Sequence, residues 1–197
     1  MFELLWPVTQ YAIATSITPG PNNIMVTVSG ANFGYWRTFP HILGIDVGFM
    51  VMVIAIGFGM GAAFEALPYL HLVLKVVGSA YMLWLAYKIA TSGPIEIGER
   101  NGQPFTFLQA AAFQWVNPKA WFMALSAIPA FTSLDGDIYR EVFFIAAVFG
   151  VFNFPCVSVW TLFGVGLGRI LKSPKSLRLF NWGMAALLAL SILPMIL

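Results

Sequence analysis

Thr18-Pro19-Gly20-Pro21-Asn22-Asn23 interrupts an apolar segment, residues 3–30, that is long enough to cross a membrane. Neither proline has a backbone N–H to donate, and each ring clashes with the preceding helical turn, so the stretch predicts a helix break. Inside a bilayer, the carbonyls freed by a break must be satisfied by protein or by a water-filled cavity. Helices broken near mid-membrane, with polar residues at the break, are typical of the substrate sites of transporters. The motif therefore favours a membrane transporter.

The composition of the chain is that of a membrane protein. Of its 197 residues 59% are hydrophobic and 9% are charged, against about a quarter charged in an ordinary soluble domain. The mean hydropathy is +0.83, and the apolar runs exceed the ~20 residues that a helix needs to span a bilayer. The net charge of +2 is too small and too dispersed to indicate a nucleic-acid partner. The N-terminus, residues 1–4, lacks the basic region of a signal peptide, so the first span is expected to be retained.

Six spans are predicted, so the expected fold is an all-α integral membrane protein with six transmembrane helices. Their approximate bounds are residues 3–30, 38–63, 68–91, 105–132, 141–168 and 176–197. The loops between the spans are short, and none could fold as a soluble domain. Residues 1–197 are therefore interpreted as a single transmembrane transporter domain.

Lysine and arginine residues outside the spans are distributed unequally between the two sides. One side holds seven of them: Arg37, Lys88, Arg100, Arg169, Lys172, Lys175 and Arg178. The other side, which carries both chain ends, holds Arg140 alone. Because cytoplasmic loops are enriched in basic residues, both termini are predicted to lie on the non-cytoplasmic side.

The first three spans resemble the last three. Ala14–Pro19 falls on Phe113–Pro118 at a shift of 99 residues, which superposes two proline breaks. Asp46 falls on Asn153 at a shift of 107, as do the glycines that close spans 2 and 5. Because each repeat has an odd number of spans, we expect two inverted three-helix repeats, with broken helices 1 and 4 meeting at the site. The repeats would comprise about residues 1–92 and 105–197. The alternative is chance, since glycine and proline are common in apolar spans.

The first break offers both polarities that a zwitterionic substrate needs. From Asn22 onward a new half-helix begins, and its free N–H groups and positive dipole end suit a carboxylate. Thr18 closes the preceding half-helix, whose unpaired carbonyls suit an ammonium group. The predicted substrate-binding residues of this break are Thr18, Pro19, Gly20, Pro21, Asn22 and Asn23. The alternative is a proline kink that only shapes helix packing.

The second break, Asn117-Pro118-Lys119, lies about thirteen residues into span 4, and all three residues are predicted to bind substrate. Proline is well placed at the start of a half-helix, and Asn117 is expected to cap it. A lysine near mid-membrane is costly if unpaired and is a functional hypothesis by default. Lys119 is therefore also a candidate proton carrier. The alternative is a lysine that extends to the headgroups.

Asp46, about seven residues into span 2, is a second candidate for proton coupling, or else a partner of Lys119. Its repeat partner Asn153 is a neutral counterpart and a candidate substrate ligand. Gly44 and Gly48 form a small-residue packing face that points roughly opposite Asp46. Both faces can be buried only if span 2 is central in the bundle.

The remaining polar residues indicate no cofactor, no metal and no enzyme. Cys156 is the single cysteine, so neither an intrachain disulfide nor a dithiol relay can form. His41 and His71 lie near span ends, have no metal-binding spacing, and are expected at the membrane interface. Four glycines are assigned to close helix packing: Gly30, Gly34, Gly78 and Gly183.

Several stretches match a known family. They are Ile17–Asn22, Gly44–Gly48, Val77–Tyr81 with Trp84–Lys88, and Val116–Ala120. On these residues the chain resembles the LysE/RhtB family of bacterial amino-acid exporters over most of its length, although spans 5 and 6 match weakly. Within that family, Trp84–Ser92 resembles the cysteine/O-acetylserine exporter subgroup most closely.

The resemblance implies export of a small amino acid or a close metabolite from the cytoplasm by proton antiport, across the bacterial cytoplasmic (inner) membrane. Many members carry an acid directly after the Gly-xxx-Gly of span 2, where this chain has Phe49, and Asp46 is the candidate substitute. The expected partners are a small amino acid, protons and the lipid bilayer, and six spans are compatible with a homodimer. Two alternatives stay open: a passive channel for small polar solutes and a subunit of a larger complex.

Overall fold

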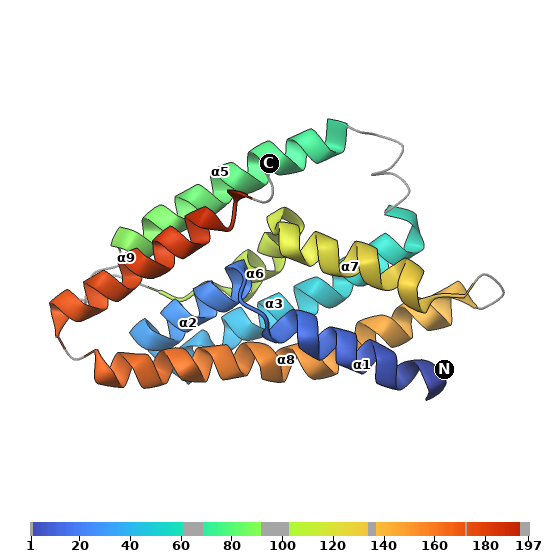
Figure 1. Cartoon of the computed structure of the whole chain (residues 1–197), viewed down its shortest axis with the longest axis horizontal. Coiled ribbons are helices and arrows are strands. Elements are labelled where there is room, and N and C mark those ends of the chain that lie inside the picture. The colour runs from blue at the N-terminus through green and yellow to red at the C-terminus, as the bar shows by residue number, and fades with distance from the viewer. Residues whose placement is uncertain (1, 61–68, 92–102, 134–136, 172, 194–197) are drawn as a thin grey trace.

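Every regular element in the described part of the chain is helical. The computed structural model describes residues 2–60, 69–91, 103–133, 137–171 and 173–193. Within them, eight α-helices and two short turns form one bundle (Figure 1). In chain order these are α1 (Phe2–Ile17), α2 (Pro21–Phe33), α3 (Tyr35–Ala55), η1 (Ile56–Met60), α5 (Tyr69–Thr91), α6 (Phe107–Phe113), η2 (Gln114–Val116), α7 (Pro118–Phe131), α8 (Ile138–Ile170) and α9 (Pro174–Leu190). The predicted all-α class is confirmed.

Both proline motifs interrupt helices, as predicted. The first predicted span is divided into α1 and α2, which residues 18–20 separate, and the fourth is divided into α6, η2 and α7. Pro21 and Pro118 each begin the helix that follows, where the missing N–H would have had no intrahelical acceptor. The breaks therefore follow from the local chemistry of proline.

Successive elements run in opposite directions along the bundle. In Figure 1 the chain runs from the N-terminus at the right through α1 and α2, returns along α3, and keeps alternating through α5, α6 with α7, α8 and α9. The left-hand end thus gathers the ends of α2, α5 and α8 and the starts of α3 and α9. The described basic residues of the predicted cytoplasmic set belong to these helix ends: Arg37, Lys88, Arg169, Lys175 and Arg178. Arg140 lies in the first turn of α8 at the other end, and Arg100 and Lys172 lie outside the described residues.

Helices α3 and α8 form the centre of the bundle. They pack along each other, α8 also contacts α1 and α2, and α3 contacts α6. Gly44 and Gly48 face α6 so closely that an added methyl group would overlap atoms of Phe107 and Ala111. Asp46 is buried as well. Both faces of this helix are therefore covered, which is the arrangement that a central span 2 requires.

Glycines let α2 and α8 approach backbone to backbone. A methyl group added to Gly30, Gly164 or Gly168 would overlap a backbone carbonyl of the helix opposite. Such small-residue contacts are how membrane helices pack closely without a hydrophobic driving force between them. Around Gly183, by contrast, no described atom lies within 4 Å of the added carbon, so its predicted role in close packing is wrong.

Gly34 is the single residue between α2 and α3. Its φ of 80° lies in the region that favours glycine, and no described atom lies within 4 Å of an added Cβ. The backbone of the turn, and not close packing as predicted, therefore requires this glycine. Across the turn the hydroxyls of Ser29 and Thr38 are hydrogen-bonded at 3.0 Å, and the Thr38 hydroxyl donates to the Gly34 carbonyl at 2.8 Å.

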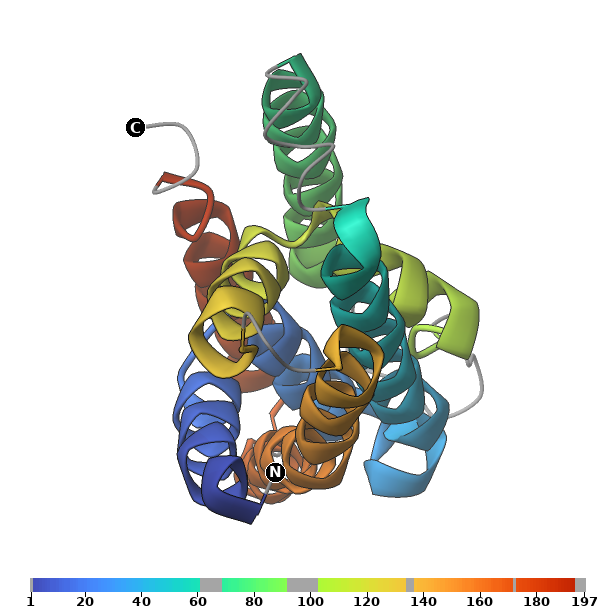
Figure 2. The same ribbon diagram turned by 90° about the vertical axis from the view of Figure 1, so that its right-hand side faces the viewer.

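Helices α5 and α9 pack on each other at one side of the bundle. Figure 2, which looks along the bundle, shows this pair on the opposite side of α7 from α1 and α8. The pair is attached to the rest of the bundle through η2, which contacts α5, and through α2, which contacts α9.

The described interior holds three apolar clusters and a set of buried polar residues that we call the polar middle layer. One cluster belongs to α1, α3, α7 and α8 and includes Phe49 and Phe149, and a second belongs to α2, α5, α6 and α9 and includes Leu188. A third, smaller cluster belongs to α2, α3, α6 and α8 and includes Ile45. The buried polar residues at and beside the two breaks are Ser16, Asn23, Asp46, Gln114, Asn117 and Asn153. Because both breaks lie in this layer, the functional candidates gather at the middle of the bundle.

Two described helices are each long and apolar enough, by length and composition, to cross a membrane. They are Tyr35–Gly59 and Ile138–Ile170, of 25 and 33 residues, each with a mean hydropathy of 2.2. The broken spans consist of shorter helices: 16 and 13 residues for α1 and α2, and 7 and 14 for α6 and α7. Each half alone is shorter than the ~20 residues that a bilayer requires.

His41 is buried, which corrects its predicted place at the interface. Its side chain is 1% exposed and packs on the ring of Phe105, with ring centroids 5.3 Å apart. The segment before α6 covers it, a contact between residues far apart in the sequence. The side chain of His71 lies outside the described residues.

Candidate functional site

The carbonyls at the end of α1 are satisfied by side chains from other elements. The Asn23 amide donates to the carbonyls of Ser16 and Thr18, both at 2.8 Å. The Trp160 indole of α8 donates to the Ile17 carbonyl at 2.9 Å. A break inside a membrane requires such partners, because lipid offers none. The first break is therefore held open by the protein itself.

Lys119 joins the second break to the first. Its ammonium Nζ donates to the Thr18 carbonyl at 2.6 Å, to the Thr18 hydroxyl at 2.8 Å and to the Pro19 carbonyl at 3.4 Å. We call these three acceptors the carbonyl cradle. The Thr18 hydroxyl in turn donates to the Thr15 carbonyl at 2.8 Å. The cradle lies at the negative end of the α1 dipole, where a cation is favoured.

Gly20 is required by the lysine that passes over it. Its φ of −177° and ψ of 176° describe extended backbone that any residue adopts. A Cβ at this position would lie 2.6 Å from Cδ of Lys119 and 3.2 Å from its Nζ. The glycine therefore makes room for the side chain of Lys119, and unusual dihedral angles are not needed here.

Gln114 forms a second junction between the breaks. Its amide donates to Asn22 Oδ1 at 3.2 Å and to the Ala110 carbonyl at 2.9 Å, and its Oε1 accepts from Asn22 Nδ2 at 2.8 Å. Gln114 is fully buried. Sequence reasoning missed this residue, although the repeat alignment places it opposite Thr15.

Asn117 caps α7, as expected. Its side chain accepts a hydrogen bond from the backbone N–H of Lys119 at 3.1 Å, and the residue is 1% exposed. Pro118 follows at the first position of the helix. The positive end of α7 is thus satisfied by its own cap.

The N-terminus of α2, by contrast, has no side-chain cap. Gly20 stands at the capping position and has no side chain to offer. The first N–H groups of a helix have no intrahelical acceptor, and together with the dipole they attract anions. Beside this terminus, Ser16 is 4% exposed, and its hydroxyl has no hydrogen-bond partner within the described part of the chain. Two independent features thus leave hydrogen-bonding capacity unused at the same place.

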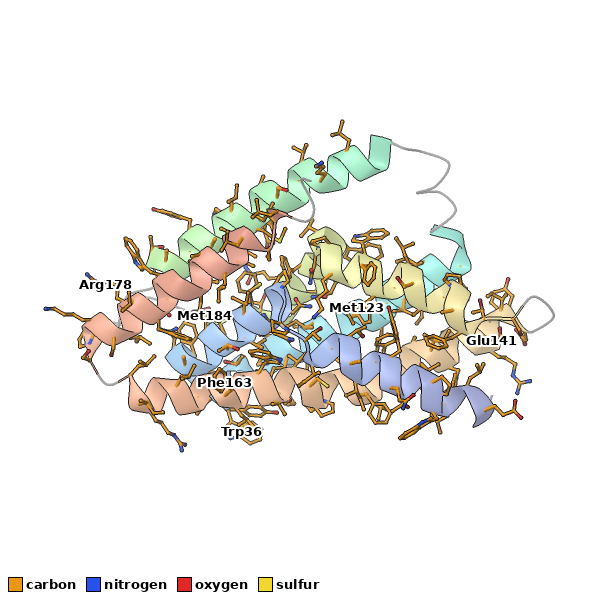
Figure 3. All side chains as sticks on the ribbon, viewed as in Figure 1. Trp36, Met123, Glu141, Phe163, Arg178 and Met184 are labelled. Carbon is orange, nitrogen blue, oxygen red and sulfur yellow. The ribbon has the colours of Figure 1, made fainter. Side chains whose placement is uncertain are left out.

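These groups surround one small cavity of about 30 Å³. Its walls are Thr15, Ser16, Gly20, Asn22, Asn23, Ile45, Phe49, Asn117, Lys119, Ala120, Met123, Asn153 and Val157. Figure 3 labels Met123 between Arg178 at one end of the bundle and Glu141 at the other. In this conformation the cavity has room for a water molecule but is too small for an amino acid.

The structure brings most of the predicted site residues to this cavity. Gly20, Asn22, Asn23, Asn117, Lys119 and Asn153 line it. Thr18 and Pro19 are exposed and contribute through the carbonyl cradle, while Pro21 and Pro118 start the two half-helices. Thr15 and Ser16 of α1 were not predicted, because nothing in an apolar helix marks which small polar side chain faces inward.

Asp46 reaches the cavity through Asn153. The Asn153 amide donates to Asp46 Oδ1 at 2.9 Å, and both residues are buried between α3 and α8. Among the described residues no ion pair joins Asp46 to Lys119, so the alternative pairing considered from the sequence is not present. Phe49, at the position where an acid is common in the resembling family, is 3% exposed and packs on Phe149.

The described residues hold no group of three or more histidine, cysteine, aspartate or glutamate side chains that could bind a metal ion. Cys156 is a buried free thiol. The chemistry that this arrangement offers is hydrogen bonding and charge pairing around a cavity.

Comparison with known proteins places these features in a family. The family model described as LysE type translocator matches residues 13–192 of the chain. Cysteine/O-acetylserine efflux proteins of Escherichia coli (strain K12), Shigella flexneri serotype 5b (strain 8401) and Shigella sonnei (strain Ss046) are each 32% identical to it over 166 residues. The matches cover 82% of this chain and 83% of each relative. No solved structure matches the chain.

Proposed function

Because this chain belongs to the LysE type translocator family, it is a membrane exporter of amino acids and not an enzyme, and we propose that it exports small neutral amino acids or close metabolites by proton antiport. Exporters of this family are inner-membrane proteins. The relatives are cysteine/O-acetylserine efflux proteins, so these two compounds are the first candidates. The observation that carries the proposal is the break between α1 and α2, which offers both polarities beside one cavity.

A zwitterion would bind across this break. Its carboxylate would accept from the uncapped N–H groups of α2, with the free hydroxyl of Ser16 as a further donor. Its ammonium would donate to the carbonyls that end α1, the group to which Thr18 and Pro19 belong. Asn117 and Asn153 line the same cavity, and their amides are placed to contact a small polar side chain.

Two inverted repeats, about residues 1–92 and 105–197 within one domain of six spans, would build this site. Support comes from pairs of residues that the sequence repeat relates. Asp46 and Asn153, equivalent at a shift of 107, contact each other where α3 crosses α8, as residues beside a twofold axis do. The packing of α1 on α8 has its counterpart in that of α6 on α3.

Alternating access would then require the cavity to widen toward one side at a time. Its present volume is too small for an amino acid. The apolar clusters that include Phe49 and Leu188 would act as the two barriers, so rocking one repeat against the other would open one and close the other.

Proton coupling is assigned to Asp46 and Lys119. They are the carboxylate and the ammonium of the polar middle layer, and ionisable groups inside a membrane mark proton relays. Asn153, which donates to Asp46 and lines the cavity, would connect the protonation of this carboxylate to the substrate.

The orientation follows from the basic end of the bundle. With that end toward the cytoplasm, as we propose, both termini would lie on the non-cytoplasmic side. A homodimer is part of the proposal, and light scattering of the detergent-solubilised protein tests it.

Efflux from proteoliposomes tests the function. Vesicles loaded with labelled cysteine, O-acetylserine, threonine, homoserine or lysine are compared with and without an imposed pH gradient, beside protein-free vesicles. We expect saturable efflux of cysteine or O-acetylserine that the gradient stimulates and a proton ionophore abolishes. Unsaturable efflux that ignores the gradient would support a passive channel instead.

A further inference from the structure

The ammonium of Lys119 occupies the place that the proposed site reserves for the ammonium of a substrate. We propose that Lys119 is a built-in competitor: substrate and lysine exchange on the carbonyl cradle, and the exchange removes the lysine's link between the two breaks while the Gln114–Asn22 junction stays. This inference rests on the proposed function and specifies which part of the substrate opens the site.

The two competing groups are chemically alike. The lysine side chain ends in a primary ammonium with three N–H donors, as does the α-amino end of an amino acid. Nζ uses two close acceptors, the Thr18 carbonyl at 2.6 Å and its hydroxyl at 2.8 Å, and one distant acceptor, the Pro19 carbonyl at 3.4 Å. A cradle that binds one primary ammonium at the negative end of a helix will bind another.

Release of the lysine leaves its two closest acceptors, both of Thr18, with other hydrogen-bond partners. The Thr18 carbonyl also accepts from Asn23 at 2.8 Å, and the Thr18 hydroxyl stays bonded to Thr15. The Thr18 carbonyl therefore keeps one hydrogen bond when the lysine leaves, which lowers the cost of the exchange. If the role of Lys119 were purely structural, we would expect its closest carbonyl acceptor to have no other hydrogen-bond donor, whereas the Thr18 carbonyl also accepts from Asn23.

Release of Lys119 has a mechanical result. The lysine belongs to α7 and its acceptors belong to the end of α1, so its hydrogen bonds hold the two half-helices together. A substrate that replaces the lysine makes its bonds to α1 alone. Occupancy of the cradle by substrate therefore removes the link that Lys119 makes between α7 and the end of α1, while the Tyr11 hydroxyl still donates to the Met123 carbonyl at 3.4 Å. Compounds without an amino group cannot produce this change.

The first test fills the cradle from solution. Lys119→Ala removes three methylene groups and the ammonium, and propylammonium supplies the same atoms. We expect propylammonium chloride to raise the thermal unfolding temperature of the detergent-solubilised variant, relative to sodium chloride at the same concentration. Wild-type protein, whose cradle is filled, should show no such rise. Lys175→Ala, at the exposed start of α9, is the matched control and should behave as wild type.

The second test measures competition directly. If the lysine occupies the cradle about nine-tenths of the time, its removal should tighten the apparent binding of O-acetylserine roughly tenfold, because the competent fraction rises. Gly20→Ala is a second route to the same state, since the added carbon would displace Cδ of Lys119. It too should tighten binding while keeping the charge. Coupled efflux should be lost in Lys119→Ala.

The inference would be overturned by no response of Lys119→Ala to propylammonium, by an equal response of wild type, or by weaker binding of O-acetylserine by the variant. Lys119→Met, which keeps the volume, is measured beside it. If Lys119→Ala and Lys119→Met both unfold while Lys119→Arg stays folded, the positive charge is needed for folding, and the proposal is rejected. The propylammonium response needs no transport, so it can succeed even if wild-type vesicles export no amino acid.

Discussion

Replacement of Gln114 by alanine tests the junction between the two breaks. The Gln114 amide pairs reciprocally with Asn22, at 2.8 and 3.2 Å, and holds the Ala110 carbonyl at 2.9 Å. Gln114 belongs to η2 and Asn22 to the first turn of α2, so the pair links the two broken spans. Gln114→Ala removes all three hydrogen bonds and leaves the Asn22 amide without this partner.

The size of the effect follows from these contacts. Hydrogen bonds between membrane helices contribute about 0.6 kcal/mol on average and about 1.7 kcal/mol at most. The reciprocal pair should therefore couple Asn22 to Gln114 by about 1–3 kcal/mol. The single variant should lose about 2–4 kcal/mol of unfolding free energy, because a fully buried side chain is also deleted and space is left behind.

A double-mutant cycle measures the coupling. Unfolding free energies of wild type, Asn22→Ala, Gln114→Ala and the double variant are obtained by titration with a denaturing detergent in mixed micelles. Gln10→Ala is the matched control, since Gln10 is exposed on α1, and it should change stability little. A coupling energy below about 0.3 kcal/mol, the usual limit of additivity, would refute the interaction.

Three further predictions concern coupling, packing and affinity. Asp46→Asn should spare exchange of substrate but flatten the pH dependence of efflux from proteoliposomes, whereas Glu3→Gln on the exposed start of α1 should not; an unchanged pH profile would remove Asp46 from coupling. Gly164→Ala should lower the thermal unfolding temperature, because its methyl group would overlap a backbone carbonyl of α2. Gly166→Ala on the same helix should raise that temperature slightly, since no described atom lies within 4 Å of its added Cβ and alanine favours the helix more than glycine does. Ser16→Ala should weaken binding of O-acetylserine severalfold in equilibrium binding, and unchanged affinity would show that this free hydroxyl does not contact substrate.

The breaks could be predicted from the sequence because they depend on local chemistry. Pro21 and Pro118 each begin a helix, and the Asn117 side chain caps α7 by accepting from the backbone N–H of Lys119, two residues further along the chain. None of these features depends on where the rest of the chain lies. The contact of Asp46 with Asn153 lies between residues that the repeat had aligned, although the alignment alone did not predict it.

The contacts between the breaks could not be predicted in the same way. That the ammonium of Lys119 reaches Thr18, or that Gln114 meets Asn22, depends on how two half-helices face each other across nearly a hundred residues of sequence. The pattern of polar and apolar residues along α1 also gave no reason to select Ser16. In an apolar membrane helix, side chains are mostly uncharged on every face, so no face is marked as the inward one.

The burial of residues near helix ends could not be predicted from the sequence either. His41 was placed at the interface from its position in the span, but a segment more than sixty residues away covers it with Phe105. Gly34 was assigned to close packing, but it is required by the turn. Its positive φ depends on the angle at which α2 meets α3, which the sequence does not reveal.

The junction at Gly34 also limits how the transporter can move. One residue spans at most about 3.5 Å, and the Ser29–Thr38 hydrogen bond fastens the two helices beside it. The link between α2 and α3 is therefore too short for α2 to slide along its axis unless α3, and with it Asp46, moves too. The half-helix whose first turn faces the cavity and the helix that bears the carboxylate are therefore linked directly, so an axial movement of one carries the other.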